Sequence, residues 1–100
     1  MTGPEARTER VCVHLAKLAG GDLLKIRFPN RAGCPDRLLV LPSRCSECYQ
    51  TTIAMVEFKS PGGSPDKHQE VVHADLRALG LKVSVIDCIA DFEDLLDAET

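Results

Sequence analysis

The stretch GCPDRLLVLPSRCSECYQTTIAMVEFKSPGG, residues 33–63, contains two apolar runs with charged residues at their ends. The first run, residues 36–41, begins at Asp36, and the second, residues 51–59, ends with Glu57 and Lys59. Their short length and aliphatic content predict two strands joined as a hairpin with a long tip. In an antiparallel pair the start of one strand lies beside the end of the next. We therefore expect Asp36 to lie near Glu57 and Lys59.

Two further elements are expected before this hairpin. Residues 5–19 repeat apolar side chains at helical spacing and end at two glycines, which predicts an amphipathic helix. The stripe expected to be buried consists of Val11, Leu15 and Leu18. Residues 22–28 alternate apolar and basic side chains, which predicts a half-buried strand with one basic face. Its expected inner face consists of Leu24, Ile26 and Phe28.

Three elements are expected after the hairpin. Ser64 is a favourable N-cap with a proline behind it, so a helix is predicted from there to about Leu79. Its expected buried stripe consists of Val72, Leu76 and Leu79. Residues 81–88 alternate like a strand, and residues 91–98 form a short acidic helix. The predicted order is α-β-β-β-α-β-α, an α/β fold with a mixed central sheet flanked by helices.

Length and composition restrict the possibilities further. One hundred residues, 44% of them apolar, predict a single domain spanning residues 1–100. No apolar run approaches the roughly 18–20 residues that span a bilayer, so no membrane partner is expected. The N-terminus is polar and lacks an apolar signal segment, which favours a cytoplasmic location. Five cysteines at scattered spacing favour reduced thiols over a disulfide framework.

The charge is unevenly distributed along the chain. The net charge is −3, but residues 87–100 contain six acidic side chains and no lysine or arginine. Residues 1–86 carry 12 basic and 9 acidic side chains. This mildly basic part of the chain permits a phosphate-binding face, although an ordinary solvated surface fits the charge equally well.

The charged residues of the hairpin suggest a chemical role. Side chains two apart on a strand share a face, so Glu57 and Lys59 point the same way, about 7 Å apart. A second carboxylate at Asp36 would repel that of Glu57 unless a cation lay between them. Oxygen ligands of this kind suit Mg²⁺ or Mn²⁺, and Lys59 could then orient a water or stabilise charge on a phosphate. From spacing alone, a solvent-facing pair at a strand end with Asp36 in a turn remains an open alternative.

The motifs GCPD, VEFK and SPGGSPDKHQ, in this order and spacing, resemble the PD-(D/E)xK nuclease superfamily. More narrowly, the chain is similar over nearly its whole length to the VRR-NUC family, in its stand-alone phage and bacterial form. This resemblance implies a restriction-endonuclease-like fold. It implies that Asp36 and Glu57 bind metal, that Lys59 is the catalytic lysine, and that Gln69 helps to build the active-site face.

The family also places a metal-binding glutamate on the first helix. By resemblance Glu9 is favoured, because it lies about three helical turns before the glycine pair. Glu5, one turn earlier, stays open as the alternative. An exposed acid near a positive helix N-terminus would explain either residue without any function.

The resemblance implies a Mg²⁺- or Mn²⁺-dependent deoxyribonuclease with no small-molecule cofactor. No base-reading motif is present, so DNA shape is the expected determinant, with Holliday junctions as the foremost branched substrate. Symmetric cutting of a junction implies a homodimer and a role in DNA repair or recombination, in the host cytoplasm if a phage encodes the protein. Alternatives are a flap, single-strand or general DNA nuclease, and a non-catalytic DNA-binding module of the same fold.

Cations around Asp36 are candidates for binding the DNA backbone. Taken singly, each would also fit an ordinary surface cation. The candidates are Lys25, Arg27, Arg31, Arg37 and Lys67.

The pair Cys45 and Cys48, at the hairpin tip, has the spacing of half a tetrahedral zinc site. No second CxxC and no HxxxH follows, so free thiols in a loop are favoured over zinc, and a zinc-bearing adaptor is a minor alternative.

Overall fold

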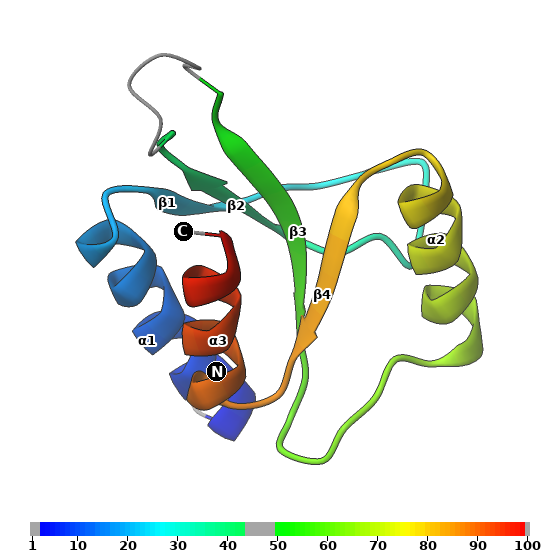
Figure 1. The fold of residues 1–100 in the computed structure, drawn as a ribbon. Helices are drawn as coiled ribbons and strands as arrows, with labels where there is room; N and C mark the ends of the chain where they lie inside the picture. Colours follow the sequence, from blue (N-terminus) through cyan, green and yellow to red (C-terminus); the bar gives the residue numbers. More distant parts are fainter. Residues whose placement is uncertain (1–2, 44–49, 100) are drawn as a thin grey trace.

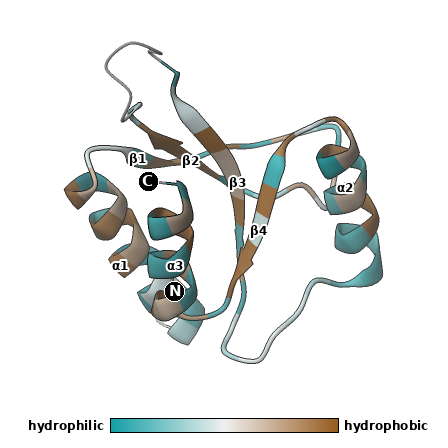
Figure 2. Ribbon diagram, viewed as in Figure 1, coloured by the Kyte–Doolittle hydropathy of each residue, from teal (hydrophilic) through white to brown (hydrophobic). Residues whose placement is uncertain are grey.

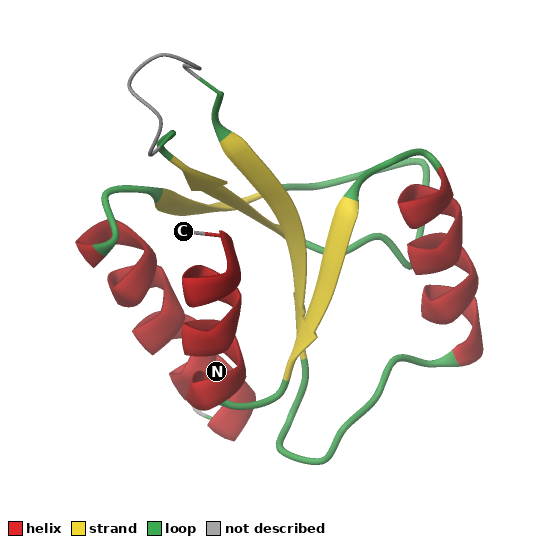
Figure 3. Ribbon diagram, in the orientation of Figure 1, coloured by secondary structure: helices red, strands yellow, loops and turns green. Residues whose placement is uncertain are grey.

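The computed structural model describes residues 3–43 and 50–99, and its elements follow the predicted order (Figure 3). The elements are α1 (Pro4–Leu18), β1 (Asp22–Lys25), β2 (Arg37–Leu41), β3 (Thr52–Phe58), α2 (Lys67–Ala78), β4 (Lys82–Ile86) and α3 (Ile89–Glu99). The predicted α/β class and element order are therefore confirmed.

The four strands form one mixed sheet in the order β1-β2-β3-β4. The first three strands are antiparallel neighbours, and β4 runs parallel to β3. A parallel connection needs a crossover, and α2 supplies it on one face of the sheet. Helices α1 and α3 lie side by side on the other face (Figure 1). The sheet is thus covered by helices on both sides.

Strand β3 is buried on both faces, which explains its nearly continuous apolar sequence. Ala54, Val56 and Phe58 belong to the core cluster that includes α1 and α3 residues, whereas Met55 packs in the smaller cluster with α2. Figure 2 shows the apolar colour on β2 and the polar colour on the first turn of α2. The buried polar residue of β3 is Glu57, which lies on the α2 face near His73.

The predicted buried stripe of α1 was wrong. The residues that are buried are Thr8, Cys12 and Ala16, while Val11 and Leu18 are 40% and 71% exposed. Helix α1 packs against both the sheet and α3, and small side chains along the contact allow the backbones to approach. Leu15 remains partly buried at the edge of this contact.

The inner face predicted for β1 was also wrong. The strand ends at Lys25, and its buried residue is Leu23, whereas Leu24 and Phe28 are 43% and 42% exposed. Because side chains alternate, burying Leu23 against the larger core turns Leu24 to the opposite face. On that opposite face, Ile26 is partly buried against the smaller core cluster, which includes residues of α2.

Helix α2 begins later than its predicted N-cap at Ser64. Asp66 is the N-cap, and it forms a capping box with Gln69: the Asp66 carboxylate accepts from the Gln69 backbone, and the Gln69 side chain accepts from the Asp66 backbone. At the other end Leu79 is the C-cap and is 80% exposed, so it does not join the buried stripe of Val72 and Leu76.

Cys45 and Cys48 lie outside the described residues. Among the residues that are described, no helix has the length and apolar content to cross a membrane.

Candidate active site

The two acidic residues of the hairpin lie opposite each other in the extended register of neighbouring strands. The register of β2 and β3 pairs Arg37 with Val56, and one further step along it brings Asp36 opposite Glu57. The backbone carbonyl of Asp36 also accepts a hydrogen bond from the Ile26 backbone N–H at 2.9 Å, which continues the pairing of β1 with β2. The sheet therefore positions Asp36 through backbone contacts on one side and brings it opposite Glu57 on the other.

Glu57 is a buried carboxyl surrounded by other acids. The residue is 9% exposed, and burial raises its pKa from 4.5 to about 7. The positive charge of Lys59 lowers this pKa, but the negative charges of Asp36, Glu5 and Asp66 add to the increase. Ionising Glu57 is therefore unfavourable unless further positive charge approaches it.

Gln69, in the first turn of α2, connects Glu57 of β3 with Lys59, which directly follows that strand. Its Oε1 accepts from Lys59 Nζ at 2.7 Å and from the Asp66 backbone at 3.0 Å. With Oε1 engaged in this way, the amide nitrogen points at Glu57 Oε1, 3.4 Å away. The capping box of α2 thus fixes Gln69, and Gln69 in turn orients Lys59 and Glu57.

His73 lies one helical turn beyond Gln69 and is 1% exposed. Its Nε2 is 3.7 Å from Glu57 Oε1, and it is the one buried side-chain nitrogen or oxygen in residues 3–43 and 50–99 that lacks a hydrogen-bond partner. Burial lowers the pKa of His73, with nearby Arg77 and Lys59 contributing. An unpartnered buried polar atom costs about 1–3 kcal/mol. The sequence prediction missed His73 as a site residue, although its position four residues after Gln69 placed both on one helix face.

Two predicted carboxylates already have cationic partners. Lys25 Nζ contacts Asp36 Oδ2 at 2.8 Å and Glu9 Oε1 at 3.8 Å. Arg37 Nε donates to Glu9 Oε1 at 2.5 Å, and Arg37 Nη1 donates to the Leu23 carbonyl at 3.1 Å. The Arg37 side chain is 19% exposed and pairs with Glu9 of α1. This arginine is therefore mostly buried and offers little surface to DNA.

Glu5 and Glu9, the two glutamates left open by the sequence, both line a pocket of about 210 Å³ with Ser60. Of these two glutamates, only Glu5 contributes to the raised pKa of Glu57, whereas Glu9 is bound to Arg37. The negative charge of Glu5 therefore acts on Glu57, while Glu9 as the metal-binding glutamate stays a prediction.

The other predicted DNA-binding cations differ in their surroundings. Arg31 forms an exposed ion pair with Asp75 at 3.2 Å. Arg27 and Lys67 are exposed and form no ion pair with any residue that the structure describes. A pocket of about 290 Å³ extends from Arg27 and Arg31 to Asp36. Of the five predicted DNA-binding cations, Arg27 and Lys67 are consequently the most accessible to a phosphate.

The loop that contains Asp36 is fixed against α2. Gly33 has a φ of +87°, and a side chain there would place its Cβ 2.8 Å from His68 Cδ2. His68 Nε2 also contacts the Ala32 carbonyl at 3.0 Å. Glycine is therefore required at position 33 both for its backbone conformation and for close approach to α2.

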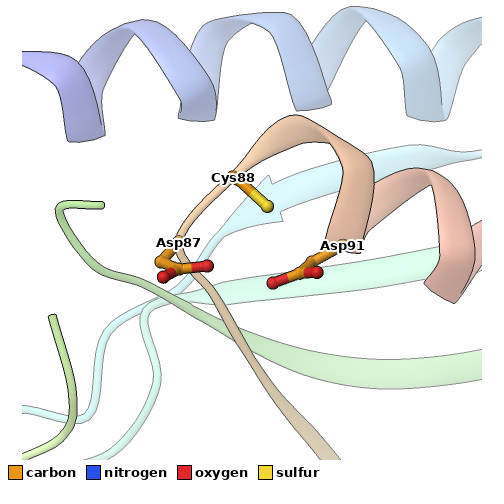
Figure 4. Close-up of side chains that lie close together, drawn as sticks. All are labelled: Asp87, Cys88 and Asp91. Atoms are coloured by element: carbon orange, nitrogen blue, oxygen red, sulfur yellow. The ribbon is translucent and has the colours of Figure 1, made fainter. Parts of the chain in front are cut away.

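A second acidic group lies at the start of α3, formed by Asp87, Cys88 and Asp91 (Figure 4). Their ligand atoms lie within 4.8 Å of one another, and among the described residues no other set of three potential ligands is this close. Asp87 accepts from the Gly62 backbone at 3.0 Å, and this bond is the main cause of the lowered pKa of Asp87. The group therefore has a structural role in fixing the loop after β3. Among the described residues, the carboxylates of Asp36, Glu57 and Glu9 are not gathered as closely, and two of them are bound by Lys25 and Arg37.

Comparison with known proteins agrees with this geometry. The chain is 37% identical over 94 residues to "Putative nuclease p44" of Acyrthosiphon pisum secondary endosymbiont phage 1, covering 94% of this chain and 92% of that protein. A solved structure described as a VRR_NUC domain superposes with a TM-score of 0.81 at 27% identity, covering 96% of this chain and 97% of that one. The chain belongs to the VRR-NUC family of nucleases. No family model matches it.

Membership of the VRR-NUC family confirms the resemblance and the restriction-endonuclease-like architecture expected from the sequence. In this VRR-NUC chain, Asp36 directly precedes β2, Glu57 lies in β3, Lys59 directly follows β3, and Gln69 lies in α2. Hydrogen bonds from Gln69 connect it to Lys59 and Glu57 at one end of the sheet. The roles of these four residues remain predictions.

Proposed function

We propose that this VRR-NUC protein is a Mg²⁺- or Mn²⁺-dependent, structure-specific DNA endonuclease that hydrolyses phosphodiester bonds in branched DNA such as Holliday junctions, as a homodimer. One observation carries the proposal. Asp36 and Glu57 oppose each other at neighbouring strand ends, and Gln69 holds Lys59 beside them through a 2.7 Å bond. Two carboxylates next to a lysine are a donor set suited to metal-assisted phosphodiester hydrolysis.

The residues present fit a divalent cation. Asp36, Glu5 and Asp66 all disfavour ionisation of Glu57, and a cation among these carboxylates would relieve that repulsion. Carboxylate oxygens are ligands that Mg²⁺ and Mn²⁺ prefer. When bound, such an ion would polarise a phosphate oxygen and lower the pKa of a water.

The residues of the chain would then have distinct tasks. Asp36 and Glu57 would hold the cation, with Glu5 or Glu9 completing the set. Lys59 would donate from Nζ to an oxygen of the scissile phosphate and stabilise the negative charge that develops there. Gln69 would keep Lys59 in place, since its Oε1 is fixed by the capping box of α2.

The DNA backbone would be bound by exposed cations near Asp36. Arg27 and Lys67 are accessible, and Lys25 could exchange its exposed contact with Asp36 for a phosphate. Contacts of this kind position DNA without reading its sequence, which supports recognition by shape. Arg37 is paired within the fold, and we propose that it orients Glu9, with any DNA contact secondary.

The homodimer follows from the proposed substrate. Symmetric cutting of a four-way junction needs two active sites related by a two-fold axis. A role in DNA repair or recombination, in the cytoplasm of a host cell, is part of the same proposal.

The test is incubation of the purified protein with labelled four-way junctions, flaps, single strands and linear duplexes. Each substrate is tested with Mg²⁺, with Mn²⁺ and with chelator. Lys59→Met and Asp36→Asn are the site variants, and Lys17→Met, at an exposed lysine in the last turn of α1, is the matched control.

We expect metal-dependent cutting of the junction that Lys17→Met retains and both site variants lose. Preferential cutting of flaps or single strands would support nuclease activity but would contradict the proposed preference for junctions. Junction binding without cutting would favour a non-catalytic module. Cleavage in chelator, or full activity in both site variants, would overturn the proposal. Sedimentation showing a strict monomer on the junction would exclude symmetric cutting.

A further inference from the structure

The two oxygens of Glu57 differ in their surroundings. Oε1 faces α2, where Gln69 Nε2 lies at 3.4 Å and His73 Nε2 at 3.7 Å. Gln69 and His73 are four residues apart, so they stack on the same face of the helix. Helix α2 thus directs two nitrogen atoms at a single oxygen of the carboxylate.

The His73 side chain is buried without a partner for Nε2. The residue is 1% exposed, and Nε2 has no hydrogen bond to any part of the chain that the structure describes. Buried polar groups are nearly always hydrogen-bonded, so an exception calls for a physical explanation. The acceptor within reach is Glu57 Oε1 at 3.7 Å, about 0.5 Å beyond the upper end of ordinary hydrogen-bond distances.

We propose that His73 is a positioning residue for Glu57: its Nε2–H donates to Glu57 Oε1, and together with Gln69 it turns Oε2 toward Asp36 and the metal. This inference rests on the proposed function, since it concerns the same site. With Oε1 held by two donors, Oε2 is the oxygen that remains for a cation.

The proposed bond requires His73 Nε2 and Glu57 Oε1 to approach more closely than their present separation of 3.7 Å. Hydrogen bonds from N–H to an ionised carboxylate shorten to about 2.7–2.9 Å, so the 3.7 Å separation would close by less than about 1 Å. A neutral imidazole has one N–H, and donation to Glu57 requires it on Nε2. The proposal therefore requires the tautomer of His73 with its proton on Nε2.

His73 acts through Glu57, not as a ligand itself. Its ring is buried beneath the carboxylate on the α2 side, and among the described residues it belongs to no group of three potential ligands. Removing the partner of a metal-binding side chain typically reduces metal affinity by about 10–100-fold. We expect a loss of that size when the donor at position 73 is removed.

The test compares three substitutions at position 73. His73→Gln can place an amide nitrogen near the position of Nε2, whereas His73→Asn is equally polar but too short to reach Glu57. His73→Leu keeps a buried side chain of suitable volume without a donor. His14→Asn, at an exposed histidine of α1, is the matched control.

Mn²⁺ affinity is measured without DNA by calorimetry on the full chain, and thermal melting in chelator reports whether each variant folds. We expect His73→Leu and His73→Asn to bind Mn²⁺ about 10–100-fold more weakly, and His73→Gln and His14→Asn to stay within a few-fold of the unmodified protein. In cleavage assays at saturating metal, the KM for DNA should remain unchanged. Nitrogen NMR of the protein loaded with diamagnetic Mg²⁺ should show the proton of His73 on Nε2.

Equal Mn²⁺ affinity in all four variants would overturn the role of His73. If His73→Leu does not fold, the comparison of His73→Gln with His73→Asn decides, and equal affinities in that pair would also overturn it. An unmodified protein that neither binds Mn²⁺ nor cleaves DNA would instead refute the proposed function. That result is distinct, because it appears before any substitution at position 73.

Discussion

Replacing Glu57 by glutamine isolates the free energy of ionising a buried carboxyl. Glutamine keeps the size and polarity of the side chain but is neutral at every pH. In the metal-free protein, the pKa of Glu57 is raised to about 7 from its ordinary value of 4.5. Between these values the folded protein retains a proton that the unfolded chain has released.

The sign follows from this difference in bound protons. Stability rises with pH where the unfolded state binds more protons, and here the folded state binds more. The contribution of Glu57 is therefore fully present below about pH 4.5 and is lost as pH rises through about 7. Above that pH both states are ionised, and the difference becomes constant.

The magnitude comes from the size of the shift. One pKa unit corresponds to about 1.4 kcal/mol, so the shift corresponds to about 3 kcal/mol. Glu57 is 9% exposed, so little of this is lost to solvent screening. For a domain of this size, about 3 kcal/mol corresponds to a change in Tm on the order of 10–20 °C.

The assay is urea unfolding of both proteins in chelator, from pH 4.5 to pH 8. Subtracting the two free energies of unfolding largely cancels the pH-dependent contributions of titratable groups elsewhere in the chain. Between pH 4.5 and pH 8, we expect the free energy of unfolding of Glu57→Gln to increase by about 3 kcal/mol relative to that of the unmodified protein. With Mn²⁺ at pH 8 the unmodified protein should be stabilised and Glu57→Gln much less. A free-energy difference that stays constant with pH to within about 0.5 kcal/mol would refute the reasoning.

Three further predictions concern individual site residues. Lys59→Met should reduce single-turnover cleavage by about 10²–10³-fold and leave Mn²⁺ affinity nearly unchanged, with Lys17→Met as the control; equal cleavage would contradict its role. Glu5→Gln should weaken Mn²⁺ binding in calorimetry more than Glu9→Gln does, because Glu9 is engaged by an arginine; the reverse order would favour Glu9. Gly33→Ala should lower the free energy of unfolding in urea by about 1–3 kcal/mol, because its φ is +87°, and an unchanged value would show that the loop adapts.

The sequence predicted the order of elements because each has a clear period and clear end signals. It also placed Asp36 beside Glu57, since an antiparallel hairpin leaves little freedom once its strands are located. Helix faces were less certain. The stripe of α1 was predicted from large apolar residues, but contact with both the sheet and α3 buried Cys12 and Ala16 instead.

Side-chain partners were the part of the site that the sequence did not specify. Arg37 follows Asp36 directly, yet strand alternation turns it to the opposite face, where it meets Glu9. The burial of His73 was missed because histidine is common both on surfaces and in cores. The Asp66 capping box was readable in principle, since Asp66 and Gln69 have the required spacing, but Ser64 and its proline offered a competing signal.

The central claim is that Asp36 and Glu57 together form the metal site of this nuclease. Anomalous diffraction from crystals soaked in Mn²⁺ tests it most directly, because the signal locates the ion without reference to activity. The account predicts a peak between the carboxylates of Asp36 and Glu57 that Glu57→Gln weakens or abolishes. A peak at Asp87, Cys88 and Asp91 in its place, or none near Asp36 at saturating Mn²⁺, would contradict it.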